Sequence, residues 1–219
     1  MKDIVLLGAG GFAREVCFLL EDNNAVCPEW NILGFLTPDT STDQIGRYPV
    51  FHDNRILLDR QEISAVCCIG SSEARKRVVA PFLHTHVRFP NIISRRAVLS
   101  DSVHLGQGNI ICASTIMTVD VTVGDFLLCN LDCSIGHDVR IGDYVTLYPK
   151  ACISGAVTIG SRVEVGTCGA VIQGLAIGDG AILGAGAVAV RDVEANVTAV
   201  GVPAQVIKRR GAVQETTHG

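Results

Sequence analysis

The sequence lacks the features that mark several large classes of protein. Its 219 residues carry 18 Lys and Arg against 22 Asp and Glu, and a net charge of −4 gives no overall positive field for nucleic acid. No uninterrupted apolar run is long enough to span a bilayer, and an acid at Asp3 does not suit a signal peptide. We therefore expect a cytoplasmic protein with no membrane segment and no nucleic-acid partner.

Cysteine is common, but its pattern lacks the usual signs of a bridge or a metal. The nine cysteines are odd in number and contain no C-x-x-C pair, so neither a disulfide framework nor a zinc site is indicated. Cys129 and Cys133 fall on inward positions of the repeat described below, where small core residues are expected. The sequence therefore predicts a reduced chain without a metal site.

The first 90 residues alternate apolar runs with amphipathic stretches. This βαβαβ pattern predicts a small Rossmann-like domain over residues 1–90, with a parallel sheet, helices on its faces and a ligand at the loops that follow the strands. The expected strands are 3–8, 30–36 and 65–70, and the expected helices are 10–22 and 72–83.

From residue 93 the apolar pattern changes to a strict period of six. Such a period suits neither an ordinary helix nor a hairpin, and it is the signature of a hexapeptide β-helix in which three hexads close one coil of about 18 residues. We expect this parallel β-helix over residues 91–200 and a C-terminal tail over 201–219. The sixteen repeat positions are Ile93, Leu99, Leu105, Ile111, Met117, Val123, Cys129, Ile135, Ile141, Leu147, Ile153, Ile159, Val165, Val171, Ile177 and Leu183.

The glycine-rich start follows a strand and precedes a helix. Gly8, Gly10 and Gly11 belong to a G-x-G-x-x-A pattern, which suits a phosphate on backbone N–H groups at a helix N-terminus. The second strand runs into Thr37 and reaches an acid only at Asp39, and the domain is too small for both Rossmann halves. A nucleoside diphosphate fits better than a dinucleotide.

Three features together resemble one family over almost the whole chain: the hexads, the start GAGGFAREV and the ending of residues 184–209 with G-V-P-A. The family is the bacterial sugar acetyltransferases related to sialic acid O-acetyltransferase and to the N-acetyltransferases of nucleotide-linked 4-amino-6-deoxy sugars. The resemblance implies a left-handed coil, acetyl-CoA as co-substrate, a nucleotide-linked amino sugar on the N-terminal domain, a role in polysaccharide biosynthesis, and a homotrimer with its site between subunits.

The family's catalytic histidine lies in a motif H-[DE]-x-x-[IL]-G, which is His137 to Gly142 here. The hexad count places His137 outside the stacked interior, and one coil onward it is followed by Gly155, which leaves room for a thioester and offers an N–H to an oxyanion. An imidazole suits the removal of a proton from an attacking amine. Asp138 either orients that ring or has another partner, and the alternative for His137 is a solvated corner histidine.

The resemblance also implies further contacts. Two departures from it, Thr37-Pro38 after the second strand and Thr146 nine residues after His137, leave the nucleotide base and the donor contacts open. Arg75 is either a phosphate ligand or a solvated helix charge, and Asn130 either touches the sugar or is a turn residue. We predict contacts to acetyl-CoA from Gly155, Thr146, Thr167, Ala185 and Lys208. We predict contacts to the nucleotide sugar from Gly8, Gly10, Gly11, Thr37, Asp39, Gly70, Ser71, Arg75 and Asn130.

The sequence thus predicts an acetyl-CoA-dependent N-acetyltransferase acting on a nucleotide-linked 4-amino-4,6-dideoxy sugar by direct attack of the amine on the thioester. O-acetylation of a sugar hydroxyl, as on sialic acid, stays open, because the same base and donor would serve it. A non-catalytic scaffold is the third interpretation. A hexapeptide carbonic anhydrase needs three histidines for zinc, and the β-helix offers only His104 and His137.

Overall fold

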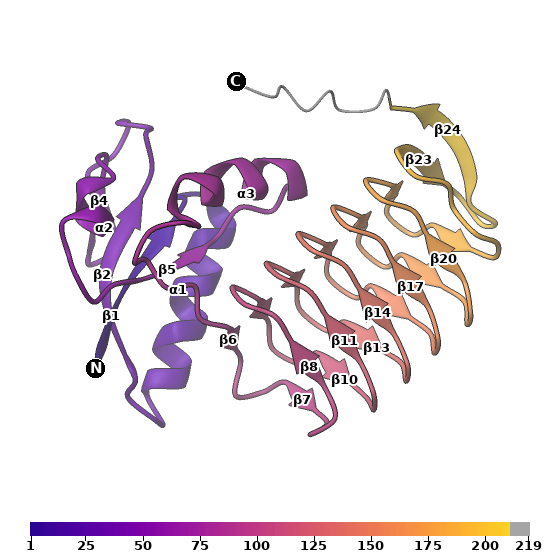
Figure 1. Ribbon diagram of the computed structural model, residues 1–219, viewed down its shortest axis with the longest axis horizontal. Helices are drawn as coiled ribbons and strands as arrows, with labels where there is room; N and C mark the ends of the chain where they lie inside the picture. The colour runs from indigo at the N-terminus through magenta and orange to yellow at the C-terminus, as the bar shows by residue number, and fades with distance from the viewer. Residues whose placement is uncertain (211–219) are drawn as a thin grey trace.

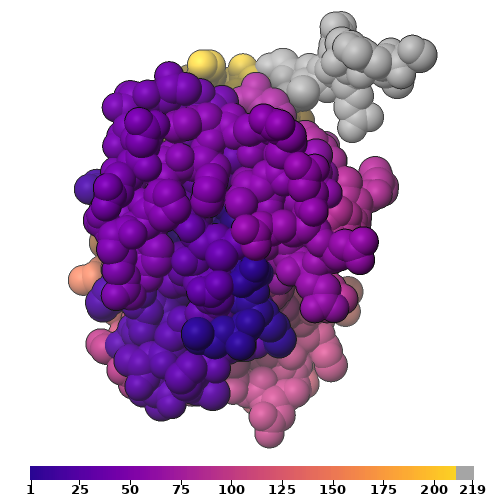
Figure 2. All heavy atoms as spheres, turned by 90° about the vertical axis from the view of Figure 1, so that its left-hand side faces the viewer, coloured from indigo at the N-terminus to yellow at the C-terminus, as the bar shows by residue number. Residues whose placement is uncertain are grey.

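The computed structural model describes residues 1–210, and they form an α/β domain followed by a parallel β-helix (Figure 1). The α/β domain lies at the end of the β-helix where the first coil begins, and the coils then stack away from it toward the C-terminus. Seen from that end, the domain covers most of the prism behind it (Figure 2). The predicted fold class is confirmed.

The sheet of the first domain has five strands in the order β3-β4-β2-β1-β5. The strands β1, β2, β4 and β5 are parallel, and β3 is an antiparallel edge paired with β4. The β3–β4 hairpin is an addition to the predicted pattern. The strands are β1 (Lys2–Leu7), β2 (Trp30–Leu36), β3 (Gln44–Ile45), β4 (Tyr48–Phe51) and β5 (Ser64–Cys67).

The helices pack their apolar sides against the sheet, and α1 lies between the sheet and the first coils of the β-helix. In α1 the residues Ala13, Val16 and Leu20 are fully buried at helical spacing, in a cluster that also contains Ile92 and Ile110 of the first coils. A second cluster joins the other side of the sheet to Phe126. The helices are α1 (Gly11–Asn24), α2 (Arg55–Leu58), α3 (Ser72–Val79) and the 3-10 turn η1 (Ala80–Phe82).

The β-helix is built from two-residue strands that follow the hexad period. Each strand pairs with strands 18 residues before and after it, as Ile135 pairs with Met117 and Ile153. The first face contains β6 (Ile92–Ile93), β9 (Ile110–Ile111), β12 (Leu128–Cys129), β15 (Thr146–Leu147), β18 (Glu164–Val165) and β21 (Ile182–Leu183). The second face contains β7 (Val98–Leu99), β10 (Ile116–Met117), β13 (Ser134–Ile135), β16 (Cys152–Ile153), β19 (Ala170–Val171) and β22 (Val188–Ala189). The third face contains β8 (His104–Leu105), β11 (Thr122–Val123), β14 (Arg140–Ile141), β17 (Thr158–Ile159) and β20 (Ala176–Ile177).

The interior of the prism is a stack of the predicted repeat residues. One apolar cluster runs from the first coils to Ala199, and most of its members are fully buried. Cys129 and Cys133 belong to this cluster, which confirms their inward placement. The parallel pairing gives every inner face continuous aliphatic contact, so the hydrophobic effect holds the coils together without any single large core residue.

The end of the described chain differs from the prediction of a tail. Residues 205–209 form β24 (Gln205–Arg209), which pairs antiparallel with β23 (Val197–Val200) at the edge of the first face. The predicted tail is therefore a strand in its first half, and its remainder, 211–219, lies outside the described residues. Between residues 1 and 210, no helix combines the length and the apolar character needed to cross a bilayer.

Candidate functional site

His137 lies where the chain turns a corner after the second face. Its Nδ1 is 2.7 Å from Oδ2 of Asp138, and about half of its side chain is exposed. Asp138 has a φ of 59°, in the left-handed region that Asp tolerates better than most residues. The backbone turn therefore brings two adjacent side chains together, and Asp138 is the partner of the imidazole.

Gly155 occupies the same corner one coil further on, as the sequence predicts. A Cβ added to Gly155 would lie 2.4 Å from Nε2 and 2.6 Å from Cε1 of His137, so only glycine leaves this space to the imidazole. Within residues 1–210 the Gly155 N–H donates to no acceptor, although Ala156 N–H donates to the His137 carbonyl at 2.7 Å. We call His137, Asp138 and Gly155 the histidine corner.

The corner after the third face has the same backbone geometry and different side chains. There Asp143 accepts a hydrogen bond from Asp125 N–H at 2.8 Å, and Asp179 accepts one from Ser161 N–H at 2.9 Å. A side chain of each coil thus accepts a hydrogen bond from the backbone N–H of the coil before it. We call this column of Gln107, Asp125, Asp143, Ser161 and Asp179 the carboxylate corner.

The remaining residues predicted to contact acetyl-CoA divide into two groups. Thr167 and Ala185 are exposed and follow first-face strands one coil apart, so they stack at a third corner. Lys208 is exposed on β24. Thr146 differs: it is fully buried, donates through Oγ1 to the Gly70 carbonyl at 2.8 Å, and has no surface to offer a ligand.

Arg75 is neither a solvated helix charge nor a free phosphate ligand. It is 1% exposed, and its guanidinium donates to carbonyls of Ile69 and Gly70 on one side and of Phe126 on the other. Further bonds of 2.9 Å reach the Tyr144 and Val145 carbonyls and Thr146 Oγ1. Burial lowers the pKa of Arg75 to about 10, so it stays charged at neutral pH.

This arginine joins the two domains, because its partners belong to the loop after β5 and to successive coils of the prism. The first turn of α3 adds a second link: Ser72 donates through both N–H and Oγ to Glu164 Oε1 at 2.9 Å. A carboxylate at the N-terminus of a helix also meets its positive dipole end. Arg162 pairs with Glu73 at 3.1 Å beside it.

The carboxyl ends of the parallel strands bring the predicted nucleotide residues to one edge of the sheet. Gly8 has a φ of +108° and donates to the Leu36 carbonyl at 2.8 Å, and a Cβ there would lie 2.8 Å from Ile69 Cδ1. The loops after β1, β2 and β5 therefore meet around Gly8. A Cβ added to Gly10 would meet nothing within 4 Å, so the space beside the start of α1 is open.

The other residues at this edge differ in how far they are already engaged. Asp39 accepts a hydrogen bond from Ser41 N–H at 2.9 Å, and its own N–H donates to Thr37 Oγ1 at 3.3 Å. Gly70 lies open on its Cα side, and Ser71 is the N-cap residue of α3. Asn130 is 9% exposed and accepts from Leu131 N–H at 2.7 Å, which is the role of a turn residue.

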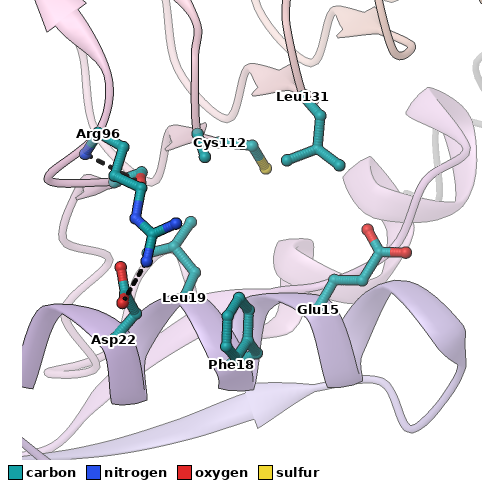
Figure 3. A pocket seen from close by; sticks show the side chains of 9 residues that line it. Glu15, Phe18, Leu19, Asp22, Arg96, Cys112 and Leu131 are labelled. Atoms are coloured by element: carbon teal, nitrogen blue, oxygen red, sulfur yellow. Dashed lines mark hydrogen bonds and ion pairs between the residues drawn. The ribbon is translucent and has the colours of Figure 1, made fainter.

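A cavity of about 130 Å³ lies between α1 and the first coils (Figure 3). Phe18, Leu19, Cys112 and Leu131 form its apolar wall, and Glu15 lies at its rim. Its walls come from both domains, so their relative placement also shapes this cavity.

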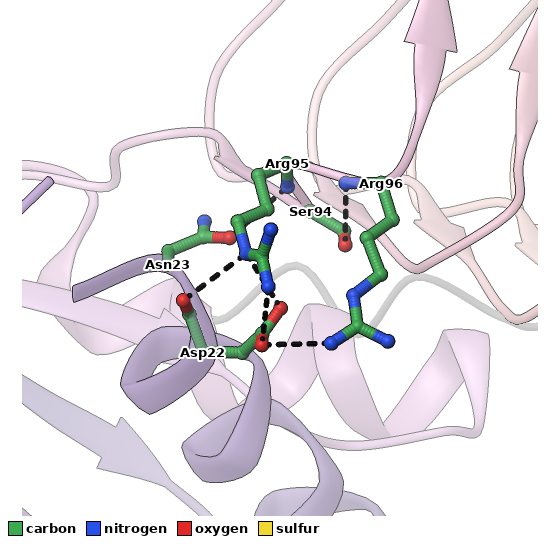
Figure 4. A network of polar contacts seen from close by, with 5 residues as sticks. All are labelled: Asp22, Asn23, Ser94, Arg95 and Arg96. Carbon is green, nitrogen blue, oxygen red and sulfur yellow. Dashed lines mark hydrogen bonds and ion pairs between the residues drawn. The ribbon is translucent and has the colours of Figure 1, made fainter. Parts of the chain in front are cut away.

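A polar network lies beside the cavity, and three of its members, Asp22, Ser94 and Arg96, also line the cavity (Figure 4). Asp22 accepts from both Arg95 and Arg96 at 2.9 Å, and Asn23 accepts from Arg95 N–H at 3.0 Å. The hydrogen bonds from Arg95, and then from Arg96, hold the pKa of Asp22 below its ordinary value. These contacts fix the C-terminal end of α1 on the first coil.

Two ionisable residues near the predicted sites are not singled out by the sequence pattern. Glu164 falls on an outward hexad position, where any polar residue is tolerated. His52 follows a four-residue strand that contains Pro49, too short and irregular for the apolar pattern to reveal. Among residues 1–210, no three His, Cys, Asp or Glu side chains converge as ligands of a metal ion would.

Known proteins that resemble this chain in sequence and fold include sugar acetyltransferases. The family described as PglD N-terminal domain matches residues 3–82. PerB of Caulobacter crescentus, in complex with CoA and GDP-perosamine, is 30% identical with a TM-score of 0.86, over 95% of this chain and 98% of that one. A variant of perosamine N-acetyltransferase from the same organism, with a histidine replaced by asparagine, is 29% identical with a TM-score of 0.87. It covers 95% of this chain and 98% of its own.

A more partial relative is the galactoside O-acetyltransferase of Escherichia coli K12, which is 31% identical over 110 residues. That match spans 49% of this chain and about half, 54%, of the relative. The hexads, the histidine corner and the near full-length similarity to PerB lead to one conclusion: the chain belongs to the hexapeptide-repeat sugar acetyltransferases.

Proposed function

We propose that this protein transfers the acetyl group of acetyl-CoA to the amino group of a nucleotide-linked 4-amino-4,6-dideoxy sugar. The observation that carries the proposal is the histidine corner, where a half-exposed imidazole, paired with Asp138, lies in the space left by the missing side chain of Gly155. Two solved relatives that are similar over nearly the whole chain length are in complex with CoA and GDP-perosamine, and they support a nucleotide-linked amino sugar as the substrate class. Family membership itself makes the chain an acetyltransferase with acetyl-CoA as donor.

The chemistry follows from Nε2, the ring nitrogen that Asp138 does not engage. The amine nitrogen attacks the thioester carbonyl carbon, a C–N bond forms, and the proton of the amine passes to Nε2 of His137. Asp138 keeps the ring oriented through Nδ1 and stabilises the imidazolium that forms. The Gly155 N–H donates to the carbonyl oxygen as negative charge develops on it, and the CoA thiolate then leaves as the C–S bond breaks.

The start of α1 is suited to the diphosphate of the substrate. The helix has no acid in its first turn and no side chain capping it, so the N–H groups after Gly10 and the positive dipole end are open to an anion. Gly10 and Gly11 are exposed at this helix start, whereas Gly8 is buried and shapes the turn before it. Asp39 is the acid nearest in sequence to the end of β2. These residues remain our candidates for the nucleotide.

A complete site needs a second chain. In one chain the histidine corner and the corner of Thr167 and Ala185 lie on opposite edges of the second face, so one ligand reaches both only in a groove between two prisms. The outward residues of that face carry no charge, and Val98 and Ile116 are 62% and 47% exposed. We therefore propose a homotrimer that packs these faces together.

The decisive assay offers the purified full-length chain acetyl-CoA and a panel of acceptors. We expect CoA release with GDP-, UDP- or dTDP-linked 4-amino sugars, with the product carrying its acetyl group on nitrogen, and none with sialic acid or galactosides. Release with the hydroxyl acceptors alone would favour O-acetylation, the second candidate, which the similarity to galactoside O-acetyltransferase supports. No binding of CoA in a calorimeter would leave only a scaffold.

The panel includes one control for mechanism. Cys152 is exposed on the second face, three residues before Gly155, and accepts a hydrogen bond from Ser134 Oγ at 3.1 Å. We expect Cys152→Ser to retain full turnover, because the amine attacks the thioester directly. Loss of turnover with an acetylated cysteine in the wild-type chain would instead indicate a covalent route.

A further inference from the structure

His52 lies at the edge of the sheet where the nucleotide is proposed to bind. It follows β4 directly, and β4 runs parallel to β2, so the carboxyl ends of both strands meet at one edge. Thr37 N–H donates to the Phe51 carbonyl at 3.0 Å, which brings the loop after β2 against the residue before His52. A histidine that the sequence pattern does not reveal is therefore placed beside the proposed base-binding loop.

Both ring nitrogens of His52 face groups that only accept hydrogen bonds. Nδ1 is 3.0 Å from the Thr37 carbonyl oxygen, and Nε2 is 3.1 Å from Oδ1 of Asp43. A carbonyl and an ionised carboxylate have no hydrogen to give, so both contacts are hydrogen bonds only when both nitrogens carry protons. A neutral imidazole has one N–H and can therefore keep only one of these two hydrogen bonds.

Backbone bonds to β4 tie both ends of residues 37–43, from Thr37 N–H to the Phe51 carbonyl at 3.0 Å and from Val50 N–H to the Asp43 carbonyl at 2.9 Å, whereas residues 38–42 have only local support. Asp39 makes bonds to Thr37 and Ser41 within the loop, and the chain then reaches Asp43 before β3 begins. The two residues directly after β2, Thr37 and Pro38, carry no acidic side chain. Asp39 is therefore the first acid after β2 that could contact a nucleotide base. The position of its carboxylate depends on how the ends of residues 37–43 are fixed.

We propose that His52, in its doubly protonated form, is a positioning residue that holds residues 37–43 in the shape that receives the nucleotide base. The inference rests on the proposed function, since the loop matters to catalysis only if a nucleotide binds there. Loss of one proton from the ring removes one of its two hydrogen bonds to the loop, so the loop is held less firmly and the nucleotide-linked substrate binds more weakly. The acetyl donor and the histidine corner are not affected.

The charges around the ring set the pH range of this effect. The hydrogen bond to the Thr37 carbonyl, then the one to Asp43, and the nearby charge of Asp39 raise the pKa of His52 above its ordinary value. Neighbouring Asp53 is already paired with Arg55 at 2.7 Å. Because the pKa is raised, both hydrogen bonds of His52 are present below about pH 6.5, and one of them is lost as the pH rises through the higher folded-state pKa.

The kinetic test compares the wild-type chain with His52→Gln and with His84→Gln, an exposed histidine of the same domain. With the nucleotide amino sugar found in the acceptor panel, we expect the wild-type KM for that sugar to rise from pH 6 to pH 8.5. In His52→Gln, KM should be about three- to tenfold higher at pH 6 and nearly independent of pH. The kcat and the KM for acetyl-CoA should stay within about twofold in both variants. A His52→Gln variant that keeps the wild-type pH dependence of KM would overturn the proposal.

A measurement without turnover separates this inference from the proposed function. We expect an NMR titration to show His52 holding its proton to higher pH than an unperturbed imidazole, and Asp43→Asn to lower the titration point of His52. Calorimetry with GDP, UDP and dTDP should show at least one nucleotide binding more weakly to His52→Gln. If no nucleotide amino sugar is acetylated, the proposed function fails. If His52 titrates like an unperturbed imidazole, the proposed positioning role of His52 fails.

Discussion

Two corners of the same prism repeat one backbone turn and carry different side chains. At the carboxylate corner, Asp143 accepts a hydrogen bond from Asp125 N–H, and Asp179 accepts one from Ser161 N–H. At the histidine corner, Gly155 has no side chain that could accept a hydrogen bond from His137 N–H, and the His137 imidazole occupies the space of that missing side chain. The fold therefore does not require His137 or Gly155, and we propose that their presence serves the chemistry.

The largest effect is expected from His137→Ala. Removal of the imidazole takes away the proposed proton acceptor, so we expect kcat to fall by about two to four decades. The side chain is half exposed and outside the apolar stack, so the melting temperature and the oligomeric state should not change. Near-normal turnover of a folded variant would remove the distinction between the two corners.

Gly155→Ala tests the space over which the imidazole lies. The new Cβ would come within 2.4 Å of Nε2, so the ring must swing out toward solvent. We expect kcat to fall by about one to two decades, because a small misplacement of a catalytic group is costly. Steady-state kinetics with both substrates would check this. Unchanged kcat would show that the close approach of Gly155 to the ring has no catalytic meaning.

Asp143→Ala is the matched change at the other corner. It removes one hydrogen bond to the backbone N–H of Asp125, so we expect the free energy of unfolding to fall by about 1 kcal/mol in urea titration. The kcat should remain within about twofold of wild type. A drop in kcat as large as that of His137→Ala would mean that damage to any corner disables the enzyme.

Much of the architecture is predictable because the hexad period leaves few alternatives. The inward stack of Ile135 and Ile153, the position of His137 outside it, and Gly155 one coil away all follow from counting sixes. Arg75 escapes this reasoning, because its burial depends on carbonyl groups of the prism more than 50 residues away in sequence. A helix position alone cannot show which surface the helix meets.

Thr146 illustrates the same limit from the other side. The resemblance to known enzymes implies a donor contact at this position, yet its side chain is fully buried between Gly70 and Arg75. The short strands β3 and β4, and with them His52, are missed because four residues with a proline carry too little pattern. Local periodicity thus predicts the prism well, but it predicts the contacts between the prism and the α/β domain poorly.

The most direct single measurement is the initial rate of CoA release by His137→Ala as imidazole is added. The corner is exposed and Gly155 leaves it open, so a free base can enter the space of the missing ring. We predict that the rate rises with imidazole concentration, while wild type and Asp143→Ala do not respond. A variant that binds both substrates and stays equally slow at every imidazole concentration would contradict proton transfer at this corner.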